Sequence, residues 1–64
     1  MEWKIDGVDE QGPNCFTRTL PSGRTVVVEA HDGFWVIGGS ATSRFDTTNF
    51  LNLDRAFAAA MTIS

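Results

Sequence analysis

The side chains most often used in catalysis are represented by one histidine and one cysteine. Asp32 follows His31, and an imidazole oriented by a carboxylate is typical of a general base. Such catalysis also needs a nucleophile and a pocket, and a tight turn on a small sheet offers neither. Cys15 would need a nearby cation or helix N-terminus to become reactive. We therefore expect His31 in an exposed turn, Cys15 as a small, partly buried apolar residue, and no enzyme activity.

Segments that resemble metal or phosphate sites lack the required pattern. Structural zinc sites use four Cys or His ligands, and the chain has one of each. The acidic residues Asp6, Asp9 and Glu10 lack the spacing of a calcium loop. The glycine-rich segment 38–43 lacks the lysine of a P-loop. We expect no metal ion and no cofactor.

Length and charge exclude further classes of function. The chain has 64 residues and a formal net charge of −3, from five basic and eight acidic side chains. Its cations are scattered singly, whereas proteins that bind nucleic acid cluster them, so we do not expect nucleic-acid binding. No apolar run approaches the roughly 20 residues that span a bilayer, and the start of the chain lacks a signal-peptide pattern. A lone cysteine suits a reducing compartment, which predicts a cytoplasmic protein of the producing or host cell.

The middle of the chain predicts two successive β-hairpins. Strands over 15–20 and 25–30 flank a Pro-Ser-Gly turn at 21–23, in which glycine supplies a positive φ. The second of these strands and a strand over 34–37 flank an Asp-Gly turn at 32–33, a strong two-residue hairpin signal.

These turns fix the register of the strands. Phe16 should lie opposite Val28, and Ala30 opposite Trp35. Because paired residues project to the same side of a sheet, one face should form the core. It collects Phe16, Val26, Val28, Ala30, Trp35 and Ile37.

The ends of the chain supply the remaining elements. We expect an opening strand over 2–6 and a polar loop over 7–14. Apolar residues then recur at helical spacing after Asn52, a good N-cap. They are Leu53, Ala56, Phe57, Ala60 and Met61. The sequence therefore predicts one α+β domain over residues 1–64, an antiparallel sheet of three or four strands with one C-terminal helix on one face. Its core should bury Trp35, Val28, Ile37, Phe16, Leu53 and Phe57 together.

A second group of apolar residues is left over. The same register places Val27, Phe34 and Val36 on the reverse of the sheet, beside Glu29 and His31. Segment 42–51 adds Phe45, Phe50 and Leu51. One helix covers one face, so these residues are buried by segment 42–51, by a second copy of the chain or by another protein. The candidate partner-binding residues are Val27, Phe34, Val36, Phe45 and Phe50.

Three segments carry a resemblance to known proteins. They are 32–35 (DGFW), 44–47 (RFDT) and 53–56 (LDRA). Together with the turn-bounded strands they resemble the arm-type DNA-binding domain of phage integrases, a three-stranded sheet backed by a helix. The strands here lack the basic residues that would meet phosphates. The same pattern is similar to short phage and prophage proteins, many of which bind and block a host protein.

These observations favour a non-catalytic protein-binding module, a phage-type inhibitor or adaptor of a host protein that acts through the second sheet face. Its partner is another protein or a second copy of the chain in a homodimer. The alternatives are a nucleic-acid-binding module of integrase-arm type and a structural, self-assembling subunit. Salt-sensitive binding to DNA or RNA would indicate the first of these, and a defined oligomer without another ligand the second.

Overall fold

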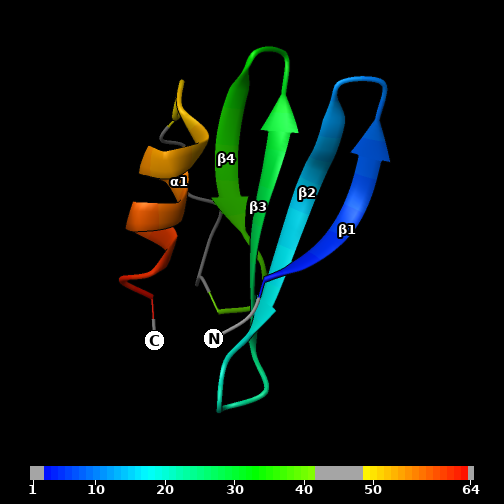
Figure 1. Cartoon of the computed structure of the whole chain (residues 1–64). Coiled ribbons are helices and arrows are strands. Elements are labelled where there is room, and N and C mark those ends of the chain that lie inside the picture. Colours follow the sequence, from blue (N-terminus) through cyan, green and yellow to red (C-terminus); the bar gives the residue numbers. More distant parts are fainter. Residues whose placement is uncertain (1–2, 42–48, 64) are drawn as a thin grey trace.

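A computed structural model describes residues 3–41 and 49–63. Its elements are β1 (Lys4–Asp9), β2 (Gly12–Thr19), β3 (Thr25–His31), β4 (Phe34–Gly38) and α1 (Leu53–Ala60). The strands form one antiparallel sheet in the order β1-β2-β3-β4, and α1 packs against β3 and β4 (Figure 1). The predicted α+β fold is confirmed, with four strands.

Both predicted hairpin turns are confirmed. Gly23 has a φ of 88°, and the backbone N–H of Gly23 donates to the carbonyl of Leu20 at 2.9 Å. Asp32 and Gly33 both have positive φ, at 39° and 88°, as a two-residue hairpin requires. The register follows from these turns: Phe16 pairs with Val28, and Ala30 pairs with Trp35.

The predicted opening strand is confirmed with different bounds, and the prediction of a loop over 7–14 was wrong. β1 runs to Asp9 and β2 begins at Gly12, so this segment is a third hairpin with a two-residue turn. Two register shifts beside Gly7 interrupt the pairing, and such bulges break the alternation by which strands are recognised. A Cβ at Gly7 would lie 2.5 Å from the Asn14 side chain, so the two strands approach closely there. The Asp9 carboxylate accepts hydrogen bonds from the Gln11 backbone at 2.8 Å and from Asn14 at 3.3 Å, which holds the turn.

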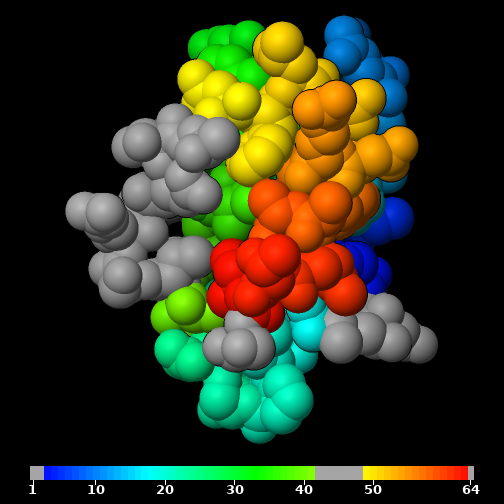
Figure 2. All heavy atoms as spheres, turned by 90° about the vertical axis from the view of Figure 1, so that its left-hand side faces the viewer, coloured from blue at the N-terminus to red at the C-terminus, as the bar shows by residue number. Residues whose placement is uncertain are grey.

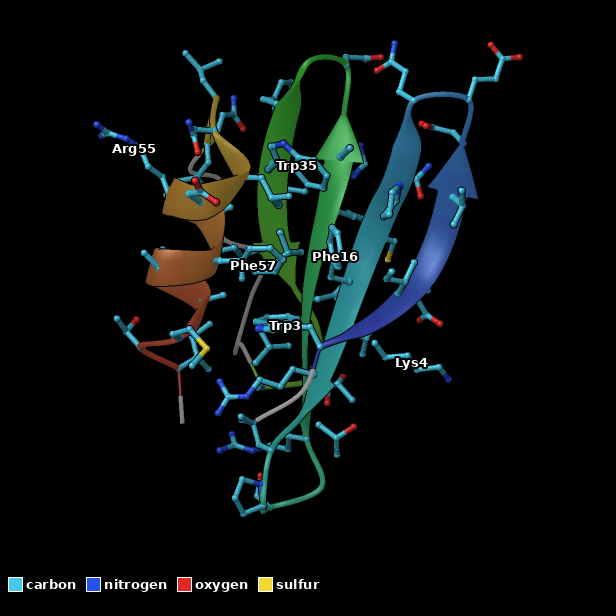
Figure 3. The ribbon with its side chains drawn as sticks, in the orientation of Figure 1. Trp3, Lys4, Phe16, Trp35, Arg55 and Phe57 are labelled. Carbon is cyan, nitrogen blue, oxygen red and sulfur yellow. The ribbon has the colours of Figure 1, made fainter. Side chains whose placement is uncertain are left out.

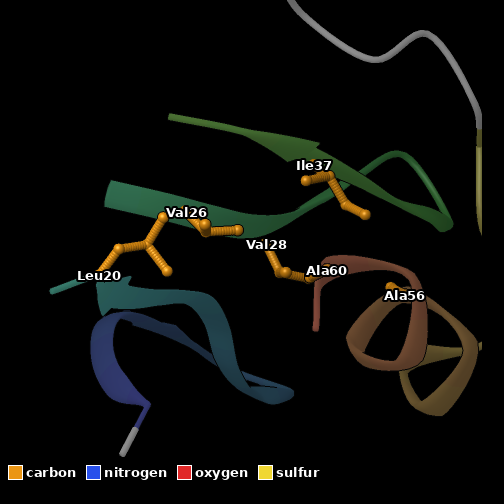
Figure 4. Packing of buried hydrophobic residues seen from close by; sticks show 6 residues of the cluster. All are labelled: Leu20, Val26, Val28, Ile37, Ala56 and Ala60. Atoms are coloured by element: carbon orange, nitrogen blue, oxygen red, sulfur yellow. The ribbon is translucent and has the colours of Figure 1, made fainter. Parts of the chain in front are cut away.

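The core lies between α1 and the sheet (Figure 4). Its buried members are Leu20, Val26, Val28, Ile37, Ala56 and Ala60. Small alanines on the buried side of α1 let the helix approach the sheet closely. Val28 and Ile37 are buried as expected, but four other predicted core residues are only half-buried: Phe16, Trp35, Leu53 and Phe57. An eight-residue helix is about 12 Å long and cannot cover the whole face.

The helix begins at a side-chain cap. Asn52 Oδ1 accepts a hydrogen bond from the backbone N–H of Asp54 at 2.8 Å, and Asp54 places an anion in the first turn. Two residues before this cap, Phe50 forms an isolated bridge with Trp35 on β4. No helix among residues 3–41 and 49–63 is long and apolar enough to cross a membrane.

Candidate functional site

The side chains with catalytic potential do not assemble into an active site among the described residues. His31 is exposed, and its Nε2 lies 3.0 Å from Oε1 of Glu29, its strand neighbour, rather than pairing with Asp32. Cys15 is partly buried on β2, as expected from its position. Within the described segments, no group of three or more His, Cys, Asp or Glu side chains could hold a metal ion.

The environment of Cys15 disfavours its thiolate. Burial raises the pKa of the Cys15 thiol above its usual value, and the negative charges of Glu29 and Asp6 raise that pKa further. A hydrogen bond with Thr17 acts in the opposite direction. The thiol is therefore protonated at neutral pH, and a protonated thiol is a poor nucleophile.

The predicted reverse face exists as a continuous surface. Glu29 pairs with Cys15 on one side and with Val36 on the other, and Val27 pairs with Thr17. Paired residues project to the same side of a sheet. The reverse face thus collects Cys15, Thr17, Val27, Glu29, His31, Phe34 and Val36. Its apolar residues Val27, Phe34 and Val36 are all half-buried, and α1 packs on the opposite face.

A polar cluster borders this apolar centre. The ring of His31 stacks on that of Phe34, with centroids 6.4 Å apart and planes inclined by 22°. Oε1 of the Glu29 carboxylate lies 3.0 Å from Nε2 of the same imidazole. On the reverse face, the His31 ring therefore contacts both Phe34 and Glu29.

The residues expected from segment 42–51 have different outcomes. Phe45 lies outside the described residues. Phe50 is half-buried and packs against the core on the helix side, so it does not join the reverse face. Leu51 is 87% exposed. Of the five candidate partner-binding residues, the structure brings together Val27, Phe34 and Val36.

An additional surface lies on the helix side of the sheet. Four half-buried aromatic rings form a continuous series, here called the aromatic row: Trp3, Phe57, Phe16 and Trp35. The centroids of Trp3 and Phe57 are 4.9 Å apart, and Phe16 lies 5.1 Å from Phe57 and 6.1 Å from Trp35. Figure 3 shows the four rings between α1 and the sheet, while Lys4 points away from them.

The aromatic row stays partly open because α1 packs over β3 and β4 and does not cover β1. Figure 2, which views the helix side, shows atoms of β1, in blue, at the margin of the helix. Ile5 pairs with Phe16 across the sheet and is 53% exposed. The sequence predicts that Phe16, Trp35 and Phe57 are buried in the core. The length of the helix indicates otherwise, because two turns of helix are too short to cover four strands.

Arg18 and Met61 continue the same surface toward the end of α1. Arg18 follows Phe16 by two residues on β2, and Met61 follows Phe57 by four residues at the helix terminus, so each shares a face with its aromatic neighbour. Nη1 of Arg18 lies 3.5 Å from Sδ of Met61. Arg18 is 6% exposed, whereas Met61 is 47% exposed.

Comparisons of the chain with protein-family models, with curated proteins and with solved structures found no match. Within the described residues, two partly open apolar surfaces on opposite faces of one sheet could bind another molecule.

Proposed function

We propose that this chain is a non-catalytic protein-binding module. The observation that carries the proposal is the aromatic row, four rings in contact that remain half-buried on a chain with little covering material. Aromatic residues, Met and Arg are the side chains enriched at protein interfaces. Met61 and Arg18 adjoin the row, and Ile5 extends it across β1. This composition suits a surface that a protein partner covers.

The reverse face offers a surface for self-association. Val27, Phe34 and Val36 form an apolar centre, and a twofold dimer would bury the same patch on both copies. We propose a homodimer through this face, with Phe34 near its centre. A chain with one surface for itself and one for a partner fits an adaptor or inhibitor of a host protein in the cytoplasm.

A nucleic-acid-binding function receives less support. An integrase-arm module would use Arg18, Arg24 and Arg44 to meet phosphates; Arg18 is 6% exposed, Arg24 lies in the turn between β2 and β3, and Arg44 lies outside the described residues. Contacts with phosphates require accessible cations. A buried guanidinium on the helix side of the sheet does not meet this requirement.

The test compares the wild-type chain with three variants. Trp3→Ser alters the aromatic row, Phe34→Asp alters the reverse face, and Leu51→Ser changes an exposed leucine outside both. Circular dichroism and thermal melting check that each variant folds. Proteins retained by the immobilised wild-type chain from host lysate are identified by mass spectrometry, purified and titrated against each variant.

We expect Trp3→Ser to weaken partner binding by about tenfold or more, the effect of losing an aromatic hot spot. Leu51→Ser should bind like the wild type. Sedimentation should show that Phe34→Asp is monomeric at concentrations where the wild type is dimeric. If no protein is retained, or if the retained proteins bind Trp3→Ser as tightly as the wild type, the proposed module is overturned. A wild type that is monomeric at all concentrations would overturn the dimer.

A further inference from the structure

Arg18 is a buried cation that has no anionic partner among residues 3–41 and 49–63. The residue is 6% exposed, and its Nε atom is buried with no hydrogen-bond partner in the part of the chain that the structure describes. The hydrogen bond that it makes, from Nη1 to the Met61 sulfur, uses a weak acceptor. The ion pair found among the described residues is between His31 and Glu29, and it does not involve Arg18. Buried charges in proteins are normally paired, so this guanidinium calls for an explanation.

Up to residue 63, no carbonyl at the end of α1 accepts a hydrogen bond from Arg18. The carbonyl of Phe57 accepts from the backbone of Met61, and the carbonyl of Ala60 accepts from that of Ile63. The carbonyl of Ala59 accepts from both the backbone and the hydroxyl of Thr62. Each of these carbonyls already accepts a hydrogen bond within the terminal turn. What the helix end can still offer the cation is the partial negative charge of its dipole.

Met61 is a cover that can be displaced. It is 47% exposed, follows the last residue of α1, and has a flexible side chain with three rotatable bonds. Movement of its thioether would open Nη1 of Arg18 toward the surface that carries Phe16 and Phe57. The guanidinium would then stand at the end of the aromatic row.

We infer that Arg18 is the receptor for a carboxylate of the bound protein, an inference that rests on the proposed function. The planar guanidinium matches a carboxylate in a bidentate pair, and apolar side chains around it exclude water and strengthen that pair. A carboxylate suits the site better than a phosphate. It carries one negative charge, and both the net charge of −3 and the helix C-terminus repel additional charge.

The test uses acetate as the probe and follows the ¹⁵N–¹H signal of each arginine Nε–H by NMR. Acetate is titrated against chloride at constant ionic strength. The Arg18 signal should shift saturably, while that of Arg55, on the exposed side of the helix, should change only slightly and linearly. The Met61→Ala variant should bind acetate at least twofold more tightly because the thioether no longer competes. If Arg18 only balances the helix dipole, its signal will not respond saturably to acetate, and the inference is overturned.

Partner titrations separate this inference from the proposed function. Arg18→Met replaces the guanidinium with an apolar side chain of similar length. It should weaken binding of the captured protein by about tenfold or more. Equal binding by the wild type and by Arg18→Met, with Trp3→Ser defective, would overturn the carboxylate receptor and leave the binding module intact. A saturable acetate shift without any Trp3-dependent partner would overturn the module and show a receptor for free carboxylates.

Discussion

Trp35 and Phe50 exchange both of their backbone hydrogen bonds, at N···O distances of 2.7 and 2.9 Å. The bridge extends the sheet by one residue beyond β4 and fixes the chain just before the helix cap at Asn52. It thereby protects part of an edge that would otherwise be free to pair with another chain. The same contact sets where α1 starts, and so which part of the sheet the helix covers.

This bridge predicts a structural role for Phe50. Phe50→Ala should lower the free energy of unfolding by about 1–3 kcal/mol, less than for a fully buried ring, because the side chain is half-buried. Leu51→Ala, at an 87% exposed neighbour, should change it by less than about 0.5 kcal/mol. Urea denaturation of the two variants measures the difference. Unchanged stability of Phe50→Ala would instead return Phe50 to the candidate partner-binding residues.

The core makes a second prediction about relative stability. Ile37 is 1% exposed, so Ile37→Ala should cost about 2–5 kcal/mol. Trp35→Ala should lower the free energy of unfolding by about 2–3 kcal/mol. This is less than for replacement of a fully buried tryptophan, because the Trp35 ring is half-buried in the aromatic row. Ile5→Ala, at a 53% exposed position, is the matched control and should change stability by less than about 0.5 kcal/mol. A larger loss for Ile5→Ala than for Ile37→Ala in urea denaturation would contradict the assignment of the core.

The predictable parts of this fold are those with local signals. The Asp32-Gly33 turn and the glycine at position 23 fix the hairpins, and side-chain alternation then fixes both faces of β3 and β4. The β1–β2 hairpin escaped prediction because the bulge at Gly7 interrupts that alternation. Its turn is held by the Asp9 carboxylate rather than by a recognisable turn pair.

The candidate site was predictable only in part. The register of the hairpins places Val27, Phe34 and Val36 together without any knowledge of packing. The aromatic row depends on where a short helix lies across a wider sheet, and no residue pattern encodes that position. Arg18 is a similar case: its spacing from Phe16 predicts the face it occupies, but not its contact with Met61, 43 residues away.

The raised pKa of Cys15 predicts a loss of stability at alkaline pH. A raised pKa means that the folded state retains the proton more strongly than the unfolded chain. The resulting stabilisation is fully present below the unfolded pKa, about 8.5 for a cysteine, and is lost as the pH rises through the folded pKa. The free energy of unfolding of the wild type, relative to that of Cys15→Ser, should therefore begin to fall as the pH rises above about 8.5. The chain has no tyrosine, so no phenol contributes to this pH dependence.

Alkylation checks the same property of Cys15 directly. Iodoacetamide should modify the native protein more slowly than the urea-unfolded protein at the same pH, because the thiolate fraction is smaller in the folded state. Native modification as fast as in urea would show that the thiol is neither shielded nor shifted in its pKa.

The last prediction concerns Gly39, where the chain leaves β4 and passes the start of β3. Its φ is +106°, and an added Cβ would lie 2.5 Å from the Thr25 carbonyl oxygen and 3.1 Å from the Val27 nitrogen. Both neighbours are backbone atoms, and the Thr25 oxygen also accepts a hydrogen bond from Ala41 at 2.8 Å, so they cannot move aside cheaply. Gly39→Ala therefore adds a steric clash to the strain of a left-handed conformation.

Gly23 supplies the matched control for Gly39. Its φ is +88°, and an added Cβ there would meet nothing within 4 Å. Gly23→Ala should cost about 1–2 kcal/mol, the strain of the conformation alone. Gly39→Ala should cost at least about 2 kcal/mol more, in the range of severely destabilising substitutions. Equal melting temperatures for the two variants would mean that the 39–41 turn moves away from β3 at little cost, and that the contact with Thr25 does not hold the end of the sheet.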